Sequence, residues 1–364
     1  MTDQQHVPLA PARHAHILAA LARDGIVRVS QLTEELGVAP VTLRRDLQQL
    51  EEEGRLERVH GGAVPASAPA LTGVAAPATG GAIAVLVPSL AYYWPGVFRG
   101  MEAEAQRRGL RLVLRGASYE LQDERPVLER LVASDDIRGL IVAPNPDAAH
   151  AQDVVQWLAS SDIPSVFVER DAVVLPGREP VESVTTDHAF GAVLAARHLA
   201  ELGHRRLGLI VSRDSPTGRK VVKGWAAACE ELELGADAHF ESLIPDRNVP
   251  GFTSAVNAAI DTALEKGATG LLIHPDPAAM AFIDIALNRG LAVPEDLSVI
   301  AYDDEVAQLF TPALTAVSPP RGAVGAAAVD LLARRLADPS RPVHRVTLSP
   351  TLHARESTAP VSHA

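Results

Sequence analysis

Apolar residues recur at helical spacing near the start of the chain. Leu43, Leu47 and Leu50 stand at positions i, i+4 and i+7, which places them on one face of a helix. The apolar residues within 17–21 have a similar spacing and predict an earlier helix, and a short helix between the two ends at Gly37. Three short helices around one apolar core are therefore expected near the N-terminus.

A turn-rich stretch follows the third helix. Gly54 ends that helix, and residues 55–62, which finish with two glycines, suit a short β-hairpin because glycine permits its tight backbone path. Residues 63–81 then consist mainly of Ala, Pro, Gly, Ser and Thr, which is typical of a semi-extended linker of roughly 3 Å per residue. The pattern predicts a helical domain with a β-wing over residues 1–62 and a linker over residues 63–81.

From Ala82 onward, short apolar runs alternate with amphipathic helices. The runs lie at residues 83–87, 110–114, 140–142, 165–168, 183–185, 207–211, 270–274 and 297–302. Continuous stretches of Val, Ile and Leu are typical of parallel strands that are covered on both faces. About nine such strand and helix units occur, which is too many for one small sheet. The expected fold of residues 82–364 is therefore α/β, with two doubly wound lobes that face each other across a cleft.

The composition is typical of a globular protein from a reducing compartment. Apolar residues make up 47% of the 364 residues and charged residues 21%, which allows sizeable cores and excludes wholesale disorder. The single cysteine, Cys229, excludes an internal disulfide and a cysteine-based zinc site. Residues 1–11 lack the pattern of a secretory signal, and prolines and glycines interrupt the apolar stretch 66–88. A cytoplasmic protein without a membrane span is expected.

The charge balance weighs against nucleic-acid binding by the chain as a whole. The net charge is −12, and contacts to phosphate require cations. Seven arginines and eight acidic residues lie between Arg13 and Gly62, so the helical N-terminal segment is not basic either. Binding to DNA must therefore depend on where the arginines stand.

Residues 13–64 resemble the DeoR-type winged helix-turn-helix, most specifically in VTLRRDLQQLEEEGRLERVHGGA. The resemblance implies that the third helix enters the major groove of double-stranded operator DNA, where arginine binds guanine or phosphate. It assigns to DNA the residues Thr42, Arg44 and Arg45 on this helix and Arg55, Arg58 and His60 on or beside the wing. Alternatively, Arg44, Arg45 and Asp46 form a solvated face with an internal ion pair. Ala39-Pro40 replaces the serine-type cap that is usual in the family.

Residues 82–358 resemble the sensor domain of the lactose/galactose-repressor (LacI/GalR) family, which shares its fold with periplasmic sugar-binding proteins. The matching segments include IAVLVPS, YYWPGVFRGMEAEAQRRG, IRGLIVAP, IPSVFVERD, VTTDHAFGAVLAARHLAELGHRRLGLI, GLAVPEDLSVIAYDD and LSPTLHARESTA. The resemblance implies a sequence-specific transcription regulator, a repressor by family habit, which forms a homodimer and carries no cofactor, metal or catalytic residue. A small molecule, with a sugar as the first choice, would bind in the cleft and control the affinity for DNA.

The resemblance assigns seven residues to this effector cleft, namely Ser89, Tyr93, Trp94, Arg170, Thr217, Arg219 and Asp276. Aromatic rings pack against the C–H face of a sugar, and the Asp276 carboxylate would accept hydrogen bonds from two adjacent hydroxyls. Structural alternatives stay open for each kind of residue. Tyr93 and Trp94 can pack under a helix, and Arg170 can pair with Asp171. Asp276 can cap a helix.

The sequence departs from the family at positions that matter for the ligand. Val221, in the segment RKVVKGW, stands where sugar-responsive members usually have arginine, so Arg219 or Lys220 would have to replace it. The dipeptide Pro275-Asp276 replaces the usual Asn-Asp. The following acidic pair, Asp303-Asp304, is interpreted as hinge or cap chemistry and not as a ligand contact.

Two other classes of protein compete with a regulator. A transport-type binding protein would share the sensor fold, but it has no helix-turn-helix and needs an export signal. An enzyme with a sugar-phosphate isomerase-like body also occurs behind this kind of head, but the sequence shows no Ser/His/Asp order, paired carboxylates or metal-spaced cluster. Residues 63–81 lack the pattern of the hinge helix of usual LacI-type heads. We therefore expect lobe closure to act through the relative placement of two heads in a dimer.

Overall fold

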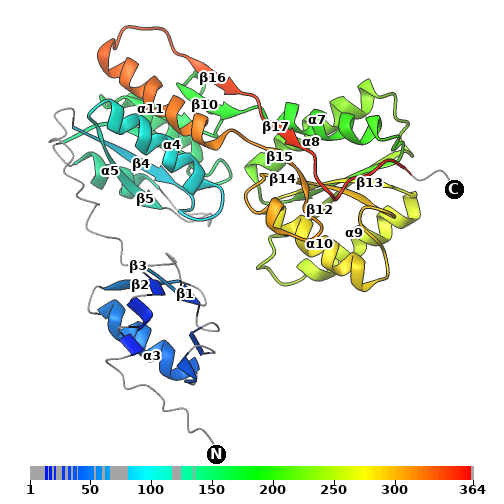
Figure 1. Cartoon of the computed structure of the whole chain (residues 1–364). Coiled ribbons are helices and arrows are strands. Elements are labelled where there is room, and N and C mark those ends of the chain that lie inside the picture. The colour runs from blue at the N-terminus through cyan, green and yellow to red at the C-terminus, as the bar shows by residue number, and fades with distance from the viewer. Residues whose placement is uncertain are drawn as a thin grey trace, which may run out of the picture. The chain divides into compact units, whose positions relative to one another are not determined.

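The computed structural model divides into two compact units, Met1–Ala76 and Pro77–Ala364, which are called the head and the body. Figure 1 shows the head and the body. The structure describes residues 13, 14, 16–18, 20, 21, 27, 28, 32, 33, 36–38, 40–52, 55–59, 62–65, 81–116, 124–133 and 136–361.

The head contains the predicted third helix and the predicted β-wing. Its described elements are β1 (Val27–Arg28), α3 (Pro40–Glu52), β2 (Leu56–Val59) and β3 (Gly62–Pro65). The three strands form an antiparallel sheet in the order β1-β3-β2. Leu43, Leu47 and Leu50 of α3 are at most 1% exposed, because their common face packs into the core of the head.

The wing continues into the stretch that the sequence assigns to the linker. Ala63 pairs with Arg58 across the hairpin, and its side chain is fully buried in the core of the head. Small residues at the start of an Ala/Pro-rich stretch therefore serve strand pairing before the linker begins. The division at residues 62 and 82 stays a prediction, and the first body strand begins at Ala82.

The first lobe of the body is a parallel six-stranded sheet with helices on its faces. The strand order is β16-β10-β7-β6-β4-β5. Its elements are β4 (Ala82–Val87), α4 (Trp94–Arg107), β5 (Arg111–Gly116), α5 (Arg125–Val132), β6 (Ile137–Val142), α6 (Ala151–Ser160), β7 (Ser165–Val168), β10 (Ser183–Thr186), α11 (Arg321–Ala337) and β16 (Arg345–Leu348). A two-stranded ribbon, β8 (Val173–Val174) with β9 (Glu179–Pro180), follows β7.

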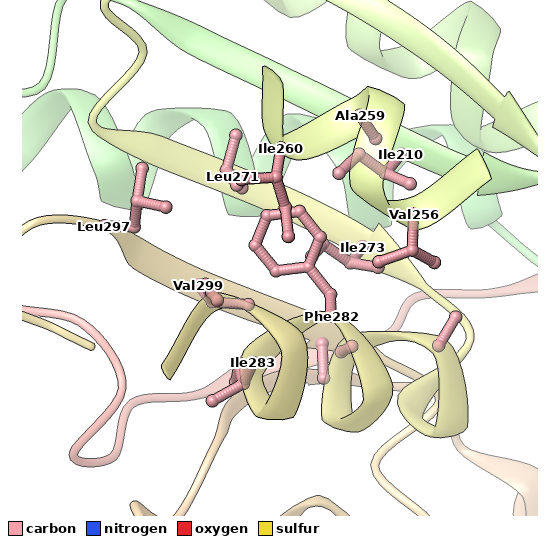
Figure 2. Packing of buried hydrophobic residues seen from close by; sticks show 14 of the residues in the cluster. Ile210, Val256, Ala259, Ile260, Leu271, Ile273, Phe282, Ile283, Leu297 and Val299 are labelled. Carbon is pink, nitrogen blue, oxygen red and sulfur yellow. The ribbon is translucent and has the colours of Figure 1, made fainter. Parts of the chain in front are cut away.

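The second lobe repeats this architecture with the strand order β12-β11-β13-β14-β15-β17, in which β17 alone runs antiparallel to its neighbour. Its elements are α7 (His188–Glu201), β11 (Leu207–Ser212), α8 (Pro216–Glu231), β12 (His239–Ile244), α9 (Phe252–Lys266), β13 (Gly270–His274), α10 (Asp276–Asn288), β14 (Ser298–Tyr302), the 3-10 helix η1 (Ala307–Leu309), β15 (Thr315–Ser318) and β17 (Thr351–His353). Figure 2 shows Phe282 of α10 packed against Ile273 and Val299 in the core of this lobe. The doubly wound α/β prediction is confirmed.

The chain passes between the two lobes at three places. It leaves the first lobe between β10 and α7, returns between β15 and α11, and leaves again between β16 and β17. Each connection is short, and Figure 1 shows α11 beside α4 in the first lobe and β17 beside α7 in the second. Lobes that are joined by a few short segments can rotate about them as rigid bodies.

Glycines bring pairs of helices into close contact in both lobes. A Cβ atom on Gly100 of α4 would overlap the carbonyl oxygen of Gly322 in α11. A Cβ atom on Gly224 of α8 would overlap the carbonyl oxygen of Ala189 in α7. Each pair of helices therefore packs backbone against backbone, which only glycine allows at these positions.

No helix in the part of the chain that the structure describes is both long enough and apolar enough to cross a membrane.

Candidate functional site

A cavity of about 520 Å³ lies between the two lobes of the body. Residues that follow β4, β7, β11 and β13 line it, among them Ser89, Arg170, Asp214 and Pro275. The carboxyl ends of parallel strands are where open α/β sheets place their ligands. The volume lies within the range of small-molecule sites in proteins.

The structure brings five of the seven predicted cleft residues to this cavity. Ser89, Tyr93, Trp94, Arg170 and Thr217 line it, whereas Arg219 and Asp276 do not. The strand-end positions of the five explain the agreement, because loops at one edge of a sheet converge.

The two predicted aromatic residues differ in their environment. Trp94 is 2% exposed and packs into the core of the first lobe, with its ring 6.4 Å from that of Phe98. Tyr93 lies edge-on to Trp94 at 5.8 Å, and its hydroxyl donates a hydrogen bond of 2.6 Å to Glu169. Tyr93 is therefore the more available of the two rings, and its orientation is fixed by Glu169.

Glu169 is the centre of a buried polar network beside the cavity. Its carboxylate accepts hydrogen bonds from the backbone N–H and the hydroxyl of Thr186, at 3.0 and 2.7 Å, and lies 3.2 Å from Nε2 of His188. Burial raises the pKa of Glu169, but the charge and the hydrogen bond of His188, with Tyr93 and Thr186, lower it to about 2. The carboxylate is thus ionised, and it links the first lobe to the first turn of α7.

Two histidines flank Tyr302 at the wall of the cavity. Nδ1 of His188 lies 3.1 Å from the Tyr302 hydroxyl, and the His274 ring lies 5.6 Å from the Tyr302 ring. Burial, and then the charge of His188, lowers the pKa of His274 to about 3, so its imidazole is neutral. Nδ1 of His274 has no hydrogen-bond partner among the described residues. A buried ring nitrogen without a partner favours a ligand that supplies one.

Arg170 is buried and bonded to backbone carbonyls. Its Nε donates to the carbonyl oxygen of Pro144 and its Nη1 to that of Glu169, both at 2.9 Å. Asp171, which the sequence offers as its surface partner, pairs with Lys220 and Arg345. The guanidinium of Arg170 is therefore held rigidly in the cavity wall.

Asp276 was predicted to contact the effector, but it does not line the cavity. Its side chain is fully buried, and its carboxylate accepts hydrogen bonds from three successive backbone N–H groups, those of Asp304 at 3.1 Å, Glu305 at 2.7 Å and Val306 at 3.1 Å. Burial raises its pKa to about 6. The aspartate closes the loop after β14 and does not face the cavity. The neighbouring Asp303, interpreted from sequence as a hinge or cap residue, lines the cavity.

Arg219 or Lys220 was expected to replace the missing arginine of the cleft, but neither does so. Val221 is fully buried in the core of the second lobe. Arg219 pairs with Asp147 and Lys220 with Asp171, and neither cation lines the cavity. The arginine that sugar-responsive relatives place at position 221 therefore has no substitute from this turn of α8.

The described part of the head exposes some of its candidate DNA residues. Arg45 and Arg55 are exposed and Thr42 is partly exposed. Asp46 points inward, where Arg13 donates to both of its carboxylate oxygens at 2.7 and 2.9 Å, so Asp46 is not part of the solvated face that the alternative required. Arg44 lies in α3 and Arg58 in β2, whereas His60 lies outside the described residues.

Comparisons with known families match both units. The model of the DeoR-like helix-turn-helix domain matches residues 13–68, and that of the periplasmic binding protein-like domain matches residues 196–358. The chain is a transcription regulator with a DeoR-like head and a LacI-type sensor body. The family predicted from the sequence is thereby confirmed for both units.

The regulator has relatives along nearly its whole length. It is 26% identical over 349 residues to the HTH-type transcriptional regulator DegA of Bacillus subtilis, covering 95% of this chain and 98% of that protein. It is 24% identical over 333 residues to the arabinose metabolism transcriptional repressor of Geobacillus stearothermophilus, covering 90% of each chain. The solved complex of the transcriptional regulator CelR with cellobiose covers 96% of this chain and 99% of that one, with 22% identity and a TM-score of 0.64. The relatives are regulators and not enzymes, as expected.

Sequence reasoning missed several polar residues of the regulator's cavity. Glu169 and His274 each stand at the end of an apolar run, at the strand end that faces a ligand, and this position was a usable signal. His188 had no such signal, because its place depends on how the chain passes between the lobes.

Proposed function

We propose that this regulator is a cytoplasmic, homodimeric repressor whose affinity for operator DNA is controlled by a sugar-like effector in the cavity between its lobes. The observation that carries the proposal is that cavity, with its aromatic and hydrogen-bonding wall, on the same chain as a helix-turn-helix. A ligand bound by both lobes favours the closed arrangement of the body, and only this difference in affinity shifts the conformational equilibrium.

The wall of the cavity supports an effector that carries hydroxyl groups. Tyr93 offers an aromatic face for the C–H surface of a sugar ring, and Arg170 and Thr217 offer donors for its hydroxyls. The neutral His274 offers a donor and an acceptor. Relatives named for arabinose metabolism and solved with cellobiose support the same class of ligand.

The head supplies the contacts to DNA in this proposal. Thr42, Arg44 and Arg45 of α3 enter the major groove, and Arg55, Arg58 and His60 bind at the wing. The proposed division keeps the predicted sensor over 82–364 and extends the predicted head, residues 1–62, to the end of β3 at Pro65, so that the linker lies between Pro65 and Ala82. Lobe closure sets how two heads of a dimer reach two half-sites, with an expected effect on operator affinity of roughly 5- to 150-fold.

The test is a binding titration of the full-length protein on a labelled duplex from upstream of its own gene. The titration is repeated with a panel of sugars and nucleosides. We expect one duplex to be preferred over random competitor DNA, and one sugar to change its affinity at least about fivefold. No preference for any duplex at low salt would refute the regulator, and a response confined to nucleosides would refute the sugar.

A further inference from the structure

Two cations at the start of α8 reach across the cleft to the first lobe. Nη1 of Arg219 lies 2.7 Å from Oδ1 of Asp147, and Nζ of Lys220 lies 2.7 Å from Oδ2 of Asp171. Asp147 follows β6 and Asp171 follows β7, both in the first lobe, whereas α8 belongs to the second. Both ion pairs therefore join the lobes directly, at a place where no peptide connects them.

The partners remain partly in contact with solvent, which makes the contact reversible. The side chains of Arg219 and Asp147 are 56% and 44% exposed, and those of Lys220 and Asp171 are 25% and 49% exposed. Such charges are rehydrated at little cost when the lobes separate, in contrast to a buried pair. None of the four residues is buried in a core of either lobe.

Asp171 is held in place from its own lobe as well. Arg345 of β16 lies 3.1 Å from its Oδ1, so the carboxylate lies between one cation of each lobe. Burial raises the pKa of Asp171, but the hydrogen bonds and charges of Lys220 and Arg345 lower it below its ordinary value. The carboxylate is thus ionised and preoriented for Lys220 whenever the lobes approach.

The ion pairs lie beside the effector cavity but not in it. Thr217 lines the cavity two residues before Arg219, and Arg170 lines it one residue before Asp171, whereas the paired residues themselves are absent from the wall. A molecule in the cavity is therefore enclosed by contacts that do not depend on its own chemistry.

We propose that Arg219–Asp147 and Lys220–Asp171 form an electrostatic clasp that holds the two lobes closed. The clasp sets the balance between open and closed bodies, and its effect on effector release rests on the proposed function of the cavity. All four residues belong to this chain, so the clasp can be tested on the protein alone.

The expected size follows from the exposure of the pairs. An exposed ion pair of good geometry shifts an equilibrium by about 1.4- to 5-fold, so two pairs favour closure by roughly 2- to 30-fold. Reversing one charge replaces attraction by repulsion and shifts the balance further toward the open body. Salt weakens the clasp, because the screening length falls from about 10 Å at 0.1 M to about 3 Å at 1 M.

The experiment measures the distance between the lobes in the full-length protein without effector. Spin labels are attached to Gln152→Cys in α6 and Ser254→Cys in α9, two exposed positions in the first turns of helices on either lobe. Double electron–electron resonance then gives the distance distribution, with unlabelled protein in excess so that one labelled chain is observed at a time. The native Cys229 is buried.

We expect Asp147→Arg to increase the share of a longer distance relative to the parent at low salt, and the exchange Asp147→Arg with Arg219→Asp to restore the parent distribution. A neutral variant, Asp147→Asn, gives a smaller shift and serves if the reversal fails to fold. The matched control is Glu231→Arg, because Glu231 pairs with Arg197 at 2.7 Å, with both side chains about half exposed, inside the second lobe.

An unchanged distribution in Asp147→Arg, or an equal shift in Glu231→Arg, would overturn the clasp. Raising the salt to about 1 M must move the parent toward the longer distance, because it screens both pairs. Failure of the sugar proposal would leave these distances untouched, and failure of the clasp would leave the operator titration untouched.

Discussion

Asp276 provides the sharpest test of how the structure assigns roles in the body. In Asp276→Ala, three backbone N–H groups lose the carboxylate that they bind at 2.7 to 3.1 Å. Hydrogen bonds to a charged group contribute about 1.5–3 kcal/mol each, or roughly 4.5–9 kcal/mol for three. The pKa of Asp276 is raised from 3.8 to about 6, which is the balance of burial against these same hydrogen bonds, so the net loss lies near the lower end of that range.

The net expectation for Asp276→Ala is a loss of about 4 kcal/mol in the free energy of unfolding of the body. A domain of this size changes its melting temperature by roughly 2–4 °C per kcal/mol, so we expect a decrease of roughly 8–16 °C. The change is read by thermal and urea denaturation followed by circular dichroism. The matched control is Asp284→Ala, which removes an exposed carboxylate from the same helix and should change the melting temperature very little.

The pH dependence gives a second measure of the same site. Because the folded protein holds the Asp276 proton up to about pH 6 and the unfolded chain releases it near pH 3.8, this group's contribution to stability falls as the pH rises through that interval. Asp276→Asn should therefore gain about 3 kcal/mol relative to the parent between pH 3.8 and 6. If Asp276→Ala melts within about 2 °C of the parent and abolishes sugar-induced stabilisation, the carboxylate contacts the effector and our assignment is refuted.

Three further predictions concern other parts of the chain. Arg45→Ala should weaken operator binding at least tenfold, as measured by fluorescence anisotropy, and leave the melting of the body unchanged; equal binding would exclude it from the DNA contacts. Because the folded protein lowers the pKa of His274 to about 3, between pH 6.5 and pH 3 only the unfolded chain binds a proton on this imidazole. Lowering the pH from neutral to 5 should therefore reduce the free energy of unfolding of the parent by about 2 kcal/mol more than that of His274→Gln, and parallel pH profiles in urea denaturation would contradict this. Gly224→Ala should destabilise the body by about 2–4 kcal/mol in urea denaturation, because its Cβ overlaps the Ala189 carbonyl; an unchanged midpoint would contradict the close packing of α7 on α8.

Sequence alone determined the features that depend on local periodicity. The spacing of Leu43, Leu47 and Leu50 predicted one buried helical face, and these leucines are buried in α3. The apolar runs after Ala82 predicted parallel strands, which the two sheets contain. Burial follows from hydrophobic patterning that a helix or strand repeats along a single stretch of chain, so the pattern is present in the sequence itself.

Only some of the residues that line the cavity could be predicted from the sequence. The family resemblance assigned Tyr93 and Thr217 to the cavity, and they line it because loops at strand ends meet at one edge of a sheet. A polar residue at the same edge of the sheet was nevertheless assigned wrongly to the cavity. Asp276 stands at such a strand end, but its carboxylate turns to the loop after β14.

Tertiary structure alone decided which charged groups meet. Arg219 and Asp147 are 72 positions apart in the sequence and belong to different lobes, yet they form an ion pair. The partner of a polar side chain depends on strand order, on register and on how the chain passes between the lobes. These are long-range properties, and no local pattern of hydrophobic and polar residues encodes them, because a charged residue at a surface position satisfies that pattern whatever it contacts.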